Sequence, residues 1–105
     1  MDIHWKIKSF ESLSVNELYD ILKLRSTIFV VEQNCVYLDL DGKDKVALHL
    51  LGEFEGKIVA YSRLFKPRIS FDNASIGRVV VDADFRSRKW GHDLMREAIQ
   101  GIKTH

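Results

Sequence analysis

Residues 75–95 have the sequence SIGRVVVDADFRSRKWGHDLM, in which an apolar run, a basic turn and a helical pattern follow one another. The three consecutive valines, Val79 to Val81, suit a strand that is buried on both faces, so we expect a central strand at 75–81. From Leu94 onward, apolar residues recur at helical spacing. This spacing predicts an amphipathic helix that begins near Trp90 and runs nearly to the C-terminus.

The turn between this strand and this helix has the features of an anion site. The first amides of a helix lack intrahelical partners, and the helix dipole places partial positive charge there. Arg86, Arg88 and Lys89 add full positive charges, and Gly91 has no Cβ to keep a diphosphate away from the backbone. A solvated loop of charges is the alternative. We expect an anionic cofactor tail as the ligand.

The N-terminal third predicts a strand followed by a helix. Apolar and polar residues alternate from Ile3 to Lys8, which is the pattern of a half-buried strand. Ser14 and Glu17 have the spacing of a capping box, so a helix is expected to begin there. Its apolar stripe, which extends to Phe29, predicts that one face packs on a sheet.

The middle of the chain predicts a β-hairpin. Val46–Glu53 and Lys57–Phe65 are strand-like runs, and the link between them contains Glu55-Gly56. The predicted order is strand, helix, irregular segment, three strands and helix. This order describes an α/β domain built on a mixed, largely antiparallel sheet flanked by helices.

Length and charge limit the classes of function. The chain has 105 residues, so we expect one domain over 1–105. The formal net charge of +1 gives no chain-wide field for nucleic acid or for an anionic membrane, and neither is an expected partner. No apolar run reaches the length of a membrane span, the N-terminus lacks the apolar region of a signal peptide, and there is one cysteine. A cytoplasmic location is expected.

The segment Asp39–Asp44 raises the question of a calcium site. With Gly42 at the sixth position of an EF-hand loop, Tyr37 and Leu48 would occupy the first and last positions, and neither is a carboxylate. The scattered histidines and the one cysteine give no zinc spacing. We therefore expect no metal.

The run Arg86-Ser87-Arg88-Lys89-Trp90-Gly91 resembles the pyrophosphate loop of GNAT acetyltransferases, Gln/Arg-x-x-Gly-x-Gly/Ala. Arg86 matches the leading basic residue and Gly91 the final small residue, whereas Lys89 stands where the pattern has its first glycine. The segments at 29–35, 39–42 and 76–81 are similar, in order and spacing, to successive signatures of the ElaA-like branch of this family. Arg25 and His49 fit the same pattern, so the resemblance spans nearly the whole chain.

The resemblance implies an N-acetyltransferase that uses acetyl-CoA as cosubstrate and no metal. The pantetheine arm would lie along the strand like an added strand, and the diphosphate would lie on the turn that follows. The implied cofactor-binding residues are Val79, Val80, Val81, Arg86, Ser87, Arg88, Lys89, Trp90, Gly91 and His92. The acceptor would be a primary amine on a small molecule or peptide, attacking the thioester directly in a ternary complex. An amide near Val79 or Val80 would stabilise the oxyanion.

The resemblance also implies a domain longer than this chain. GNAT domains continue past the last helix with a strand, a helix and a hairpin, and the tyrosine that typically acts as general acid lies in that part. No catalytic residue is therefore assigned, and 1–105 is expected to be an incomplete GNAT domain. The exposed edge of the strand at 75–81 is then a candidate surface for a homodimer. The alternative function is a catalytically incomplete acyl-CoA-binding or protein-interaction module.

Several residues keep two interpretations. His49 is a base in an acceptor cleft or, more typically for a lone histidine on a strand, a hydrogen-bonded structural residue. Glu32 and Gln33 line an acceptor site or form a polar cluster at a helix end. Trp90 is a packing residue or a lid on the turn, rather than a base-stacking platform. Cys35 is by default a packed thiol, and a nucleophile is the alternative. The basic stretch of Arg63, Lys66 and Arg68 is a solvated loop, or it reaches the 3′-phosphate of CoA.

Overall fold

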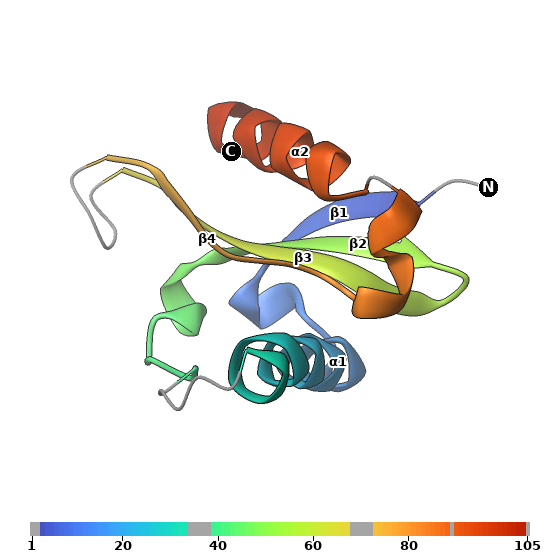
Figure 1. The fold of residues 1–105 in the computed structure, drawn as a ribbon. Coiled ribbons are helices and arrows are strands. Elements are labelled where there is room, and N and C mark those ends of the chain that lie inside the picture. The colour runs from blue at the N-terminus through green and yellow to red at the C-terminus, as the bar shows by residue number, and fades with distance from the viewer. Residues whose placement is uncertain (1–2, 34–38, 68–72, 89, 105) are drawn as a thin grey trace.

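The protein is built on one antiparallel sheet whose strands follow one another in space as they do in the sequence (Figure 1). The computed structural model describes residues 3–33, 39–67, 73–88 and 90–104. The sheet has the order β1-β2-β3-β4, and each neighbouring pair is antiparallel. Its strands are β1 (His4–Ser9), β2 (Leu48–Phe54), β3 (Lys57–Phe65) and β4 (Ser75–Val81). The predicted fold class is confirmed.

The two main helices lie on opposite faces of this sheet (Figure 1). On one face, α1 (Val15–Arg25) packs Ile21 and Leu24 against Tyr61 of β3. On the other face, α2 (Trp90–Thr104) packs Leu94 and Ala98 against the sheet. Both predicted helices are confirmed. None of the helices in the described segments has the length and apolar character needed to cross a bilayer.

The start of α1 is fixed by the capping box that the sequence predicts. The Glu17 amide donates to Ser14 Oγ at 3.0 Å, and the Ser14 amide donates to Glu17 Oε1 at 2.9 Å. These bonds satisfy amides that have no partner within the helix. At its other end, α1 continues into a π-helical segment, η2 (Ser26–Glu32), which carries the expected stripe as far as Phe29 in a wider winding.

The hairpin between β2 and β3 turns at the predicted position. Glu55 and Gly56 have φ values of 51° and 78°, the pair of positive angles that a type I′ turn requires. The observed β3 has the predicted bounds, whereas β2 begins at Leu48 rather than at Val46. Val46 instead ends a short 3₁₀ turn, η3 (Asp44–Val46).

The expectation that 75–81 forms a central strand is wrong for this sheet. Among the described residues β4 is an edge strand, and β3 is the strand with nearly every residue buried. Val79 is 38% exposed, although Val80 is buried against the α1 face. The apolar composition of the valine run therefore identified a strand, but not its position in the sheet.

A β-bulge interrupts the pairing of β4 with β3. Val80 lies opposite Tyr61 and Gly77 lies opposite Arg63, so β4 carries one residue more than β3 between these pairs. Arg78, at the bulge, has a φ of 50°, in the left-handed region that residues with a side chain rarely adopt. The sequence analysis did not predict this bulge, although a glycine within a strand pattern, here Gly77, is a known signal for one.

Candidate functional site

The basic turn after β4 is a 3₁₀ helix, η4 (Ala83–Arg88), that leads into the start of α2. Trp90 is buried and stacks on Phe85, with ring centroids 5.6 Å apart, and its ring lies 5.0 Å from that of Phe54. Trp90 is therefore a packing residue, as one of the two interpretations held. Its role is to fix the position of the first turn of α2 relative to η4 and the sheet.

Arg86 is held on both sides by the fold. Its Nε donates to the Val81 carbonyl oxygen at 3.2 Å, and its Nη1 lies 2.8 Å from Glu32 Oε1. The Arg86 side chain is 46% exposed, so its charge still faces solvent. Glu32, at the end of η2, thus has its partner in η4, and this contact does not decide between the acceptor site and the helix-end polar cluster proposed for it.

Some backbone N–H and C=O groups of β4 point to the outer edge of the sheet. The Asp82 amide donates to the Val59 carbonyl of β3 at 2.7 Å. Successive strand residues direct their backbone groups to opposite sides, so Val81 and, two residues earlier, Val79 direct theirs away from β3. The Val81 carbonyl oxygen already accepts a hydrogen bond from Arg86 Nε. Val79 is therefore the position in the valine run where a strand-like ligand fits best.

The remaining predicted residues of the turn are described to different extents. A Cβ added at Gly91 would lie 3.9 Å from Val81 Cγ2, in ordinary van der Waals contact, so the fold itself does not require a glycine there. His92 is exposed on the first turn of α2. Ser87 and Arg88 belong to η4 by their backbone, and their side chains lie outside the described part of the chain. Lys89 and Cys35 lie outside the described residues.

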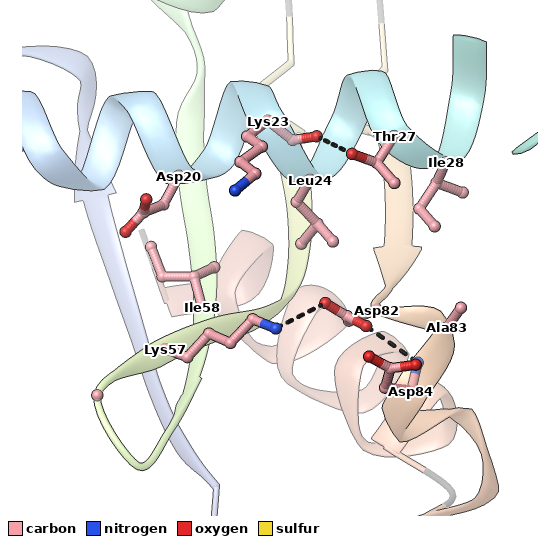
Figure 2. Close-up of a pocket in the computed structure, with 11 residues that line it drawn as sticks. Asp20, Lys23, Leu24, Thr27, Ile28, Lys57, Ile58, Asp82, Ala83 and Asp84 are labelled. Atoms are coloured by element: carbon pink, nitrogen blue, oxygen red, sulfur yellow. Dashed lines mark hydrogen bonds and ion pairs between the residues drawn. The ribbon is translucent and has the colours of Figure 1, made fainter. Parts of the chain in front are cut away.

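A cavity of about 420 Å³ lies between α1, the β2–β3 turn and the start of η4 (Figure 2). Leu24, Ile28 and Ile58 contribute apolar surface, and Lys57 reaches Asp82 across its lower side at 3.4 Å. Three aspartates and two lysines line the cavity, and this excess of carboxylates does not favour a diphosphate. The cavity is thus distinct from the predicted diphosphate turn, and the sequence analysis did not anticipate it.

A closed ring of charged side chains reaches β4 at Arg78, the middle residue of the strand. It was not predicted from the sequence. Arginines and aspartates alternate around the ring, and neighbouring charged atoms are 2.8 to 3.4 Å apart. Its members, in order, are Arg25, Asp39, Arg78, Asp41, Arg63 and Asp44. We call this set the arginine–aspartate ring. It joins the end of α1, the segment before β2, β3 and β4.

For two members of the ring, the structure differs from what the sequence led us to expect. Arg63 is buried and binds Asp41 through two bonds of 2.8 Å, so the interpretation of Arg63 as part of a solvated basic stretch is wrong. Lys66 is exposed as expected, and Arg68 lies outside the described residues. Hydrogen bonds from Arg63 hold the pKa of Asp41 well below its usual range. The carboxylates of the segment that resembled a calcium loop thus have arginine partners.

His49 has a structural position beside the ring. Its Nε2 bonds the Asp44 carbonyl oxygen at 2.9 Å, which only a protonated nitrogen can do, so Nδ1 accepts from the Tyr61 hydroxyl in the neutral ring. Burial lowers the pKa of His49 and raises that of Tyr61, which keeps both side chains neutral. With both nitrogens engaged and the ring buried, His49 is a structural residue, not a base in a cleft.

The apolar patterns of the sequence contain a signal for the ring. Arg25 lies four residues after Ile21 and three before Ile28, on the buried stripe of the first helix, and Arg63 lies within the apolar run of β3. A buried arginine needs carboxylate partners. The Asp39–Asp44 segment is the acidic stretch that supplies them.

The fold and the turn can now be compared with known proteins. Residues 15–105 match the sequence model of the family described as "Acetyltransferase (GNAT) family". The chain belongs to the GNAT acetyltransferase family.

Curated relatives place this GNAT chain beside ElaA, as the sequence resemblance indicated. It is 39% identical to Protein ElaA of Escherichia coli (strain K12) over 105 residues, which are 98% of this chain and 69% of that protein. It is 44% identical to a UPF0039 protein of Schizosaccharomyces pombe over 103 residues, which are 97% of this chain and 67% of that protein.

Solved structures of GNAT proteins agree with the fold. The crystal structure of Escherichia coli ElaA matches with a TM-score of 0.92 and 39% identity, over 99% of this chain and 72% of that chain. The crystal structure of an acyl-CoA N-acyltransferase from Pseudomonas aeruginosa matches with a TM-score of 0.92 and 38% identity, over 98% of this chain and 72% of that chain. The overall fold is thus shared with relatives of high structural similarity.

Proposed function

We propose that the chain acts as an N-acetyltransferase that transfers the acetyl group of acetyl-CoA to a primary amine. Family membership supports an acyltransferase, and the geometry of β4 and η4 supports where the cosubstrate binds. The observation that carries the proposal is the outward-facing backbone of Val79 next to Arg86 and the first turn of α2. The pantetheine arm would bind along the outer edge of β4, with the diphosphate at residues 86–92.

The reaction follows from the chemistry of a thioester and an amine. An alkyl ammonium group has a pKa of about 10.4, so it must lose a proton before its nitrogen can attack the thioester carbonyl. The neutral amine adds to the carbonyl carbon, which forms the C–N bond and leaves negative charge on the oxygen. The nitrogen then loses its extra proton, the C–S bond breaks as the carbonyl re-forms, and the departing thiolate takes up a proton. An amide of β4 at Val79 would donate to the carbonyl oxygen as negative charge develops on it.

A binding and turnover experiment tests this proposal. Calorimetric titration with acetyl-CoA measures binding, and release of free CoA thiol over a panel of primary amines measures transfer. Saturable binding with amine-dependent thiol release supports the acetyltransferase. Binding without thiol release would instead support a catalytically incomplete acyl-CoA-binding module, and absence of binding would contradict both.

The charge of Arg86 provides a specific prediction within this proposal. Arg86→Gln removes the positive charge beside the turn, so we expect the dissociation constant for acetyl-CoA to rise about tenfold, as for the loss of one charge-assisted hydrogen bond. Glu32→Gln is the matched control, because it breaks the same Arg86–Glu32 pair but keeps the arginine. Equal weakening in both variants would show that the pair, and not the charge, matters for binding.

A further inference from the structure

The left-handed backbone of Arg78 is a conformation that the surrounding structure has to maintain. A residue with a Cβ is strained at a φ of 50° relative to an ordinary strand conformation. Such a conformation persists only where the neighbouring contacts determine it. The arginine–aspartate ring supplies those contacts at Arg78.

Contacts with Asp39 and Asp41 tie the Arg78 guanidinium to the segment before β2. Its Nε donates to Asp39 Oδ1 at 3.0 Å, and its Nη2 donates to the Asp39 carbonyl at 3.2 Å and lies 3.4 Å from Asp41 Oδ2. Asp39 and Asp41 are in turn held by Arg25 and Arg63. Arg78 is therefore anchored to a connected set of side chains that also includes Arg25 of α1 and Arg63 of β3.

The bulge at Arg78 determines which amides of β4 face outward. The side of the strand to which backbone N–H and C=O groups point alternates from residue to residue, and an extra residue shifts this alternation by one position. Beyond the bulge, the pairing of Val80 with Tyr61 and the bond from Asp82 to Val59 leave Val79 directed away from β3. Without the extra residue, the two halves of β4 could not keep their present registers with β3.

We propose that Arg78 is a positioning residue for acetyl transfer: through its contacts with Asp39 and Asp41 it holds the bulge that aims the Val79 amide at the thioester carbonyl. This inference rests on the proposed function. Arg78 touches no reacting atom in this scheme and acts through the backbone of its neighbour. The ring is thus the support of the oxyanion donor.

Two substitutions separate the side-chain anchor from the backbone conformation. Arg78→Ala removes the anchor and keeps the unfavourable cost of a positive φ, whereas Arg78→Gly removes the anchor but adopts a positive φ freely. Arg96→Ala is the control, because Arg96 is an exposed residue of α2 whose partners are Asp93 and Glu97. All variants are compared as the full chain, with melting curves to measure the folded fraction.

We expect Arg78→Ala to lower kcat about tenfold or more while KM for acetyl-CoA changes less than about threefold, since a misaimed oxyanion donor acts on the transition state. Arg78→Gly should recover part of the lost kcat, and Arg96→Ala should resemble the parent chain. A kcat for Arg78→Ala within twofold of the parent overturns the proposal. So does a loss that only follows the folded fraction, or a glycine variant as slow as the alanine variant.

A second measurement does not depend on turnover. Three-bond HN–Hα couplings and chemical shifts in NMR spectra report the φ of residue 78, which should be positive in the parent and glycine variants and negative in Arg78→Ala. A positive φ in Arg78→Ala would show that the ring does not hold the bulge. The φ of residue 78 could depend on Arg78 in this way while the parent chain neither binds acetyl-CoA nor acetylates an amine. That result would refute the proposed function alone.

Discussion

Gly52, in the middle of β2, shows how closely single residues are packed beside the aromatic part of the core. A Cβ added there would lie 2.7 Å from Cζ3 of Trp5 and 3.1 Å from Cβ of Ala60. The Trp5 ring would have to rotate out of its present position, and the Ala60 methyl group can move away only with its strand backbone. We therefore expect Gly52→Ala to lower the free energy of unfolding by about 1–3 kcal/mol, measured by chemical denaturation.

Gly77 provides the matched comparison on another strand. A Cβ added there meets no atom within 4 Å. Gly77→Ala should therefore leave the free energy of unfolding unchanged or raise it by up to about 1 kcal/mol, because alanine loses less backbone freedom on folding. Equal destabilisation by the two alanines would contradict the packing explanation at Gly52.

For single residues, the sequence predicted the environment of some side chains and not of others. The environment of Trp90 and the capping pair of Ser14 and Glu17 followed from local patterns. The partners of Arg25 and Arg63 did not, because ion pairs between residues 14 to 22 positions apart depend on the tertiary fold. The predicted roles of Val79 and Arg86 in binding remain predictions.

Between elements, Glu17 ties the start of α1 to β1. Its carboxylate lies 2.8 Å from Lys6 Nζ and 2.9 Å from Lys8 Nζ, and its side chain is 12% exposed. Burial acts to raise the pKa of Glu17, but hydrogen bonds from Lys6, the Ser14 amide and Lys8 outweigh it and lower the pKa to about 2. The folded state therefore binds the proton of Glu17 less readily than the unfolded chain.

This difference predicts a loss of stability in acid. The contribution of Glu17 is fully present above the unfolded pKa of roughly 4.3 and is lost as the pH falls toward 2. Across that window the parent chain should lose about 1–3 kcal/mol that Glu17→Gln does not lose, as followed by urea denaturation at each pH. Glu53→Gln, which removes the other partner of Lys6, should retain the acid-dependent loss. A parallel pH dependence in the parent and Glu17→Gln would contradict this account.

The sequence predicted most elements because their signals are local. The bounds of β3 and β4 and the turn at Glu55-Gly56 were recovered, since strand runs and turn residues act over a few positions. The edge position of β4 followed from the family resemblance and not from the valine run, and its bulge at Arg78 and the π-helical winding of η2 were not predicted. Each of these depends on what lies beside the segment, which composition alone does not report.

For the molecule as a whole, we propose that a second copy of the chain pairs with the outer edge of β4. In the part of the chain that the structure describes, β4 pairs with a strand on one side, and Val79 is exposed. A strand edge of this kind favours pairing with another strand. We expect sedimentation equilibrium to give about twice the monomer mass of 12.2 kDa in the absence of ligand.

The same edge is the proposed position of the pantetheine arm, so ligand and second copy should compete. Saturating acetyl-CoA is expected to shift the sedimenting species toward the monomer. A monomer without ligand contradicts the homodimer. A dimer that persists in saturating acetyl-CoA, with binding shown by calorimetry, contradicts a shared edge.

The arginine–aspartate ring also constrains how this sequence can change over evolutionary time. Its three cations and three anions balance, so replacement of any one member leaves an uncompensated charge among buried neighbours, at a cost of several kcal/mol. A lineage can therefore retain all six positions, or exchange them together through paired replacements. Substitutions at these positions should be correlated among descendants, even though the six residues come from four separate stretches of the chain.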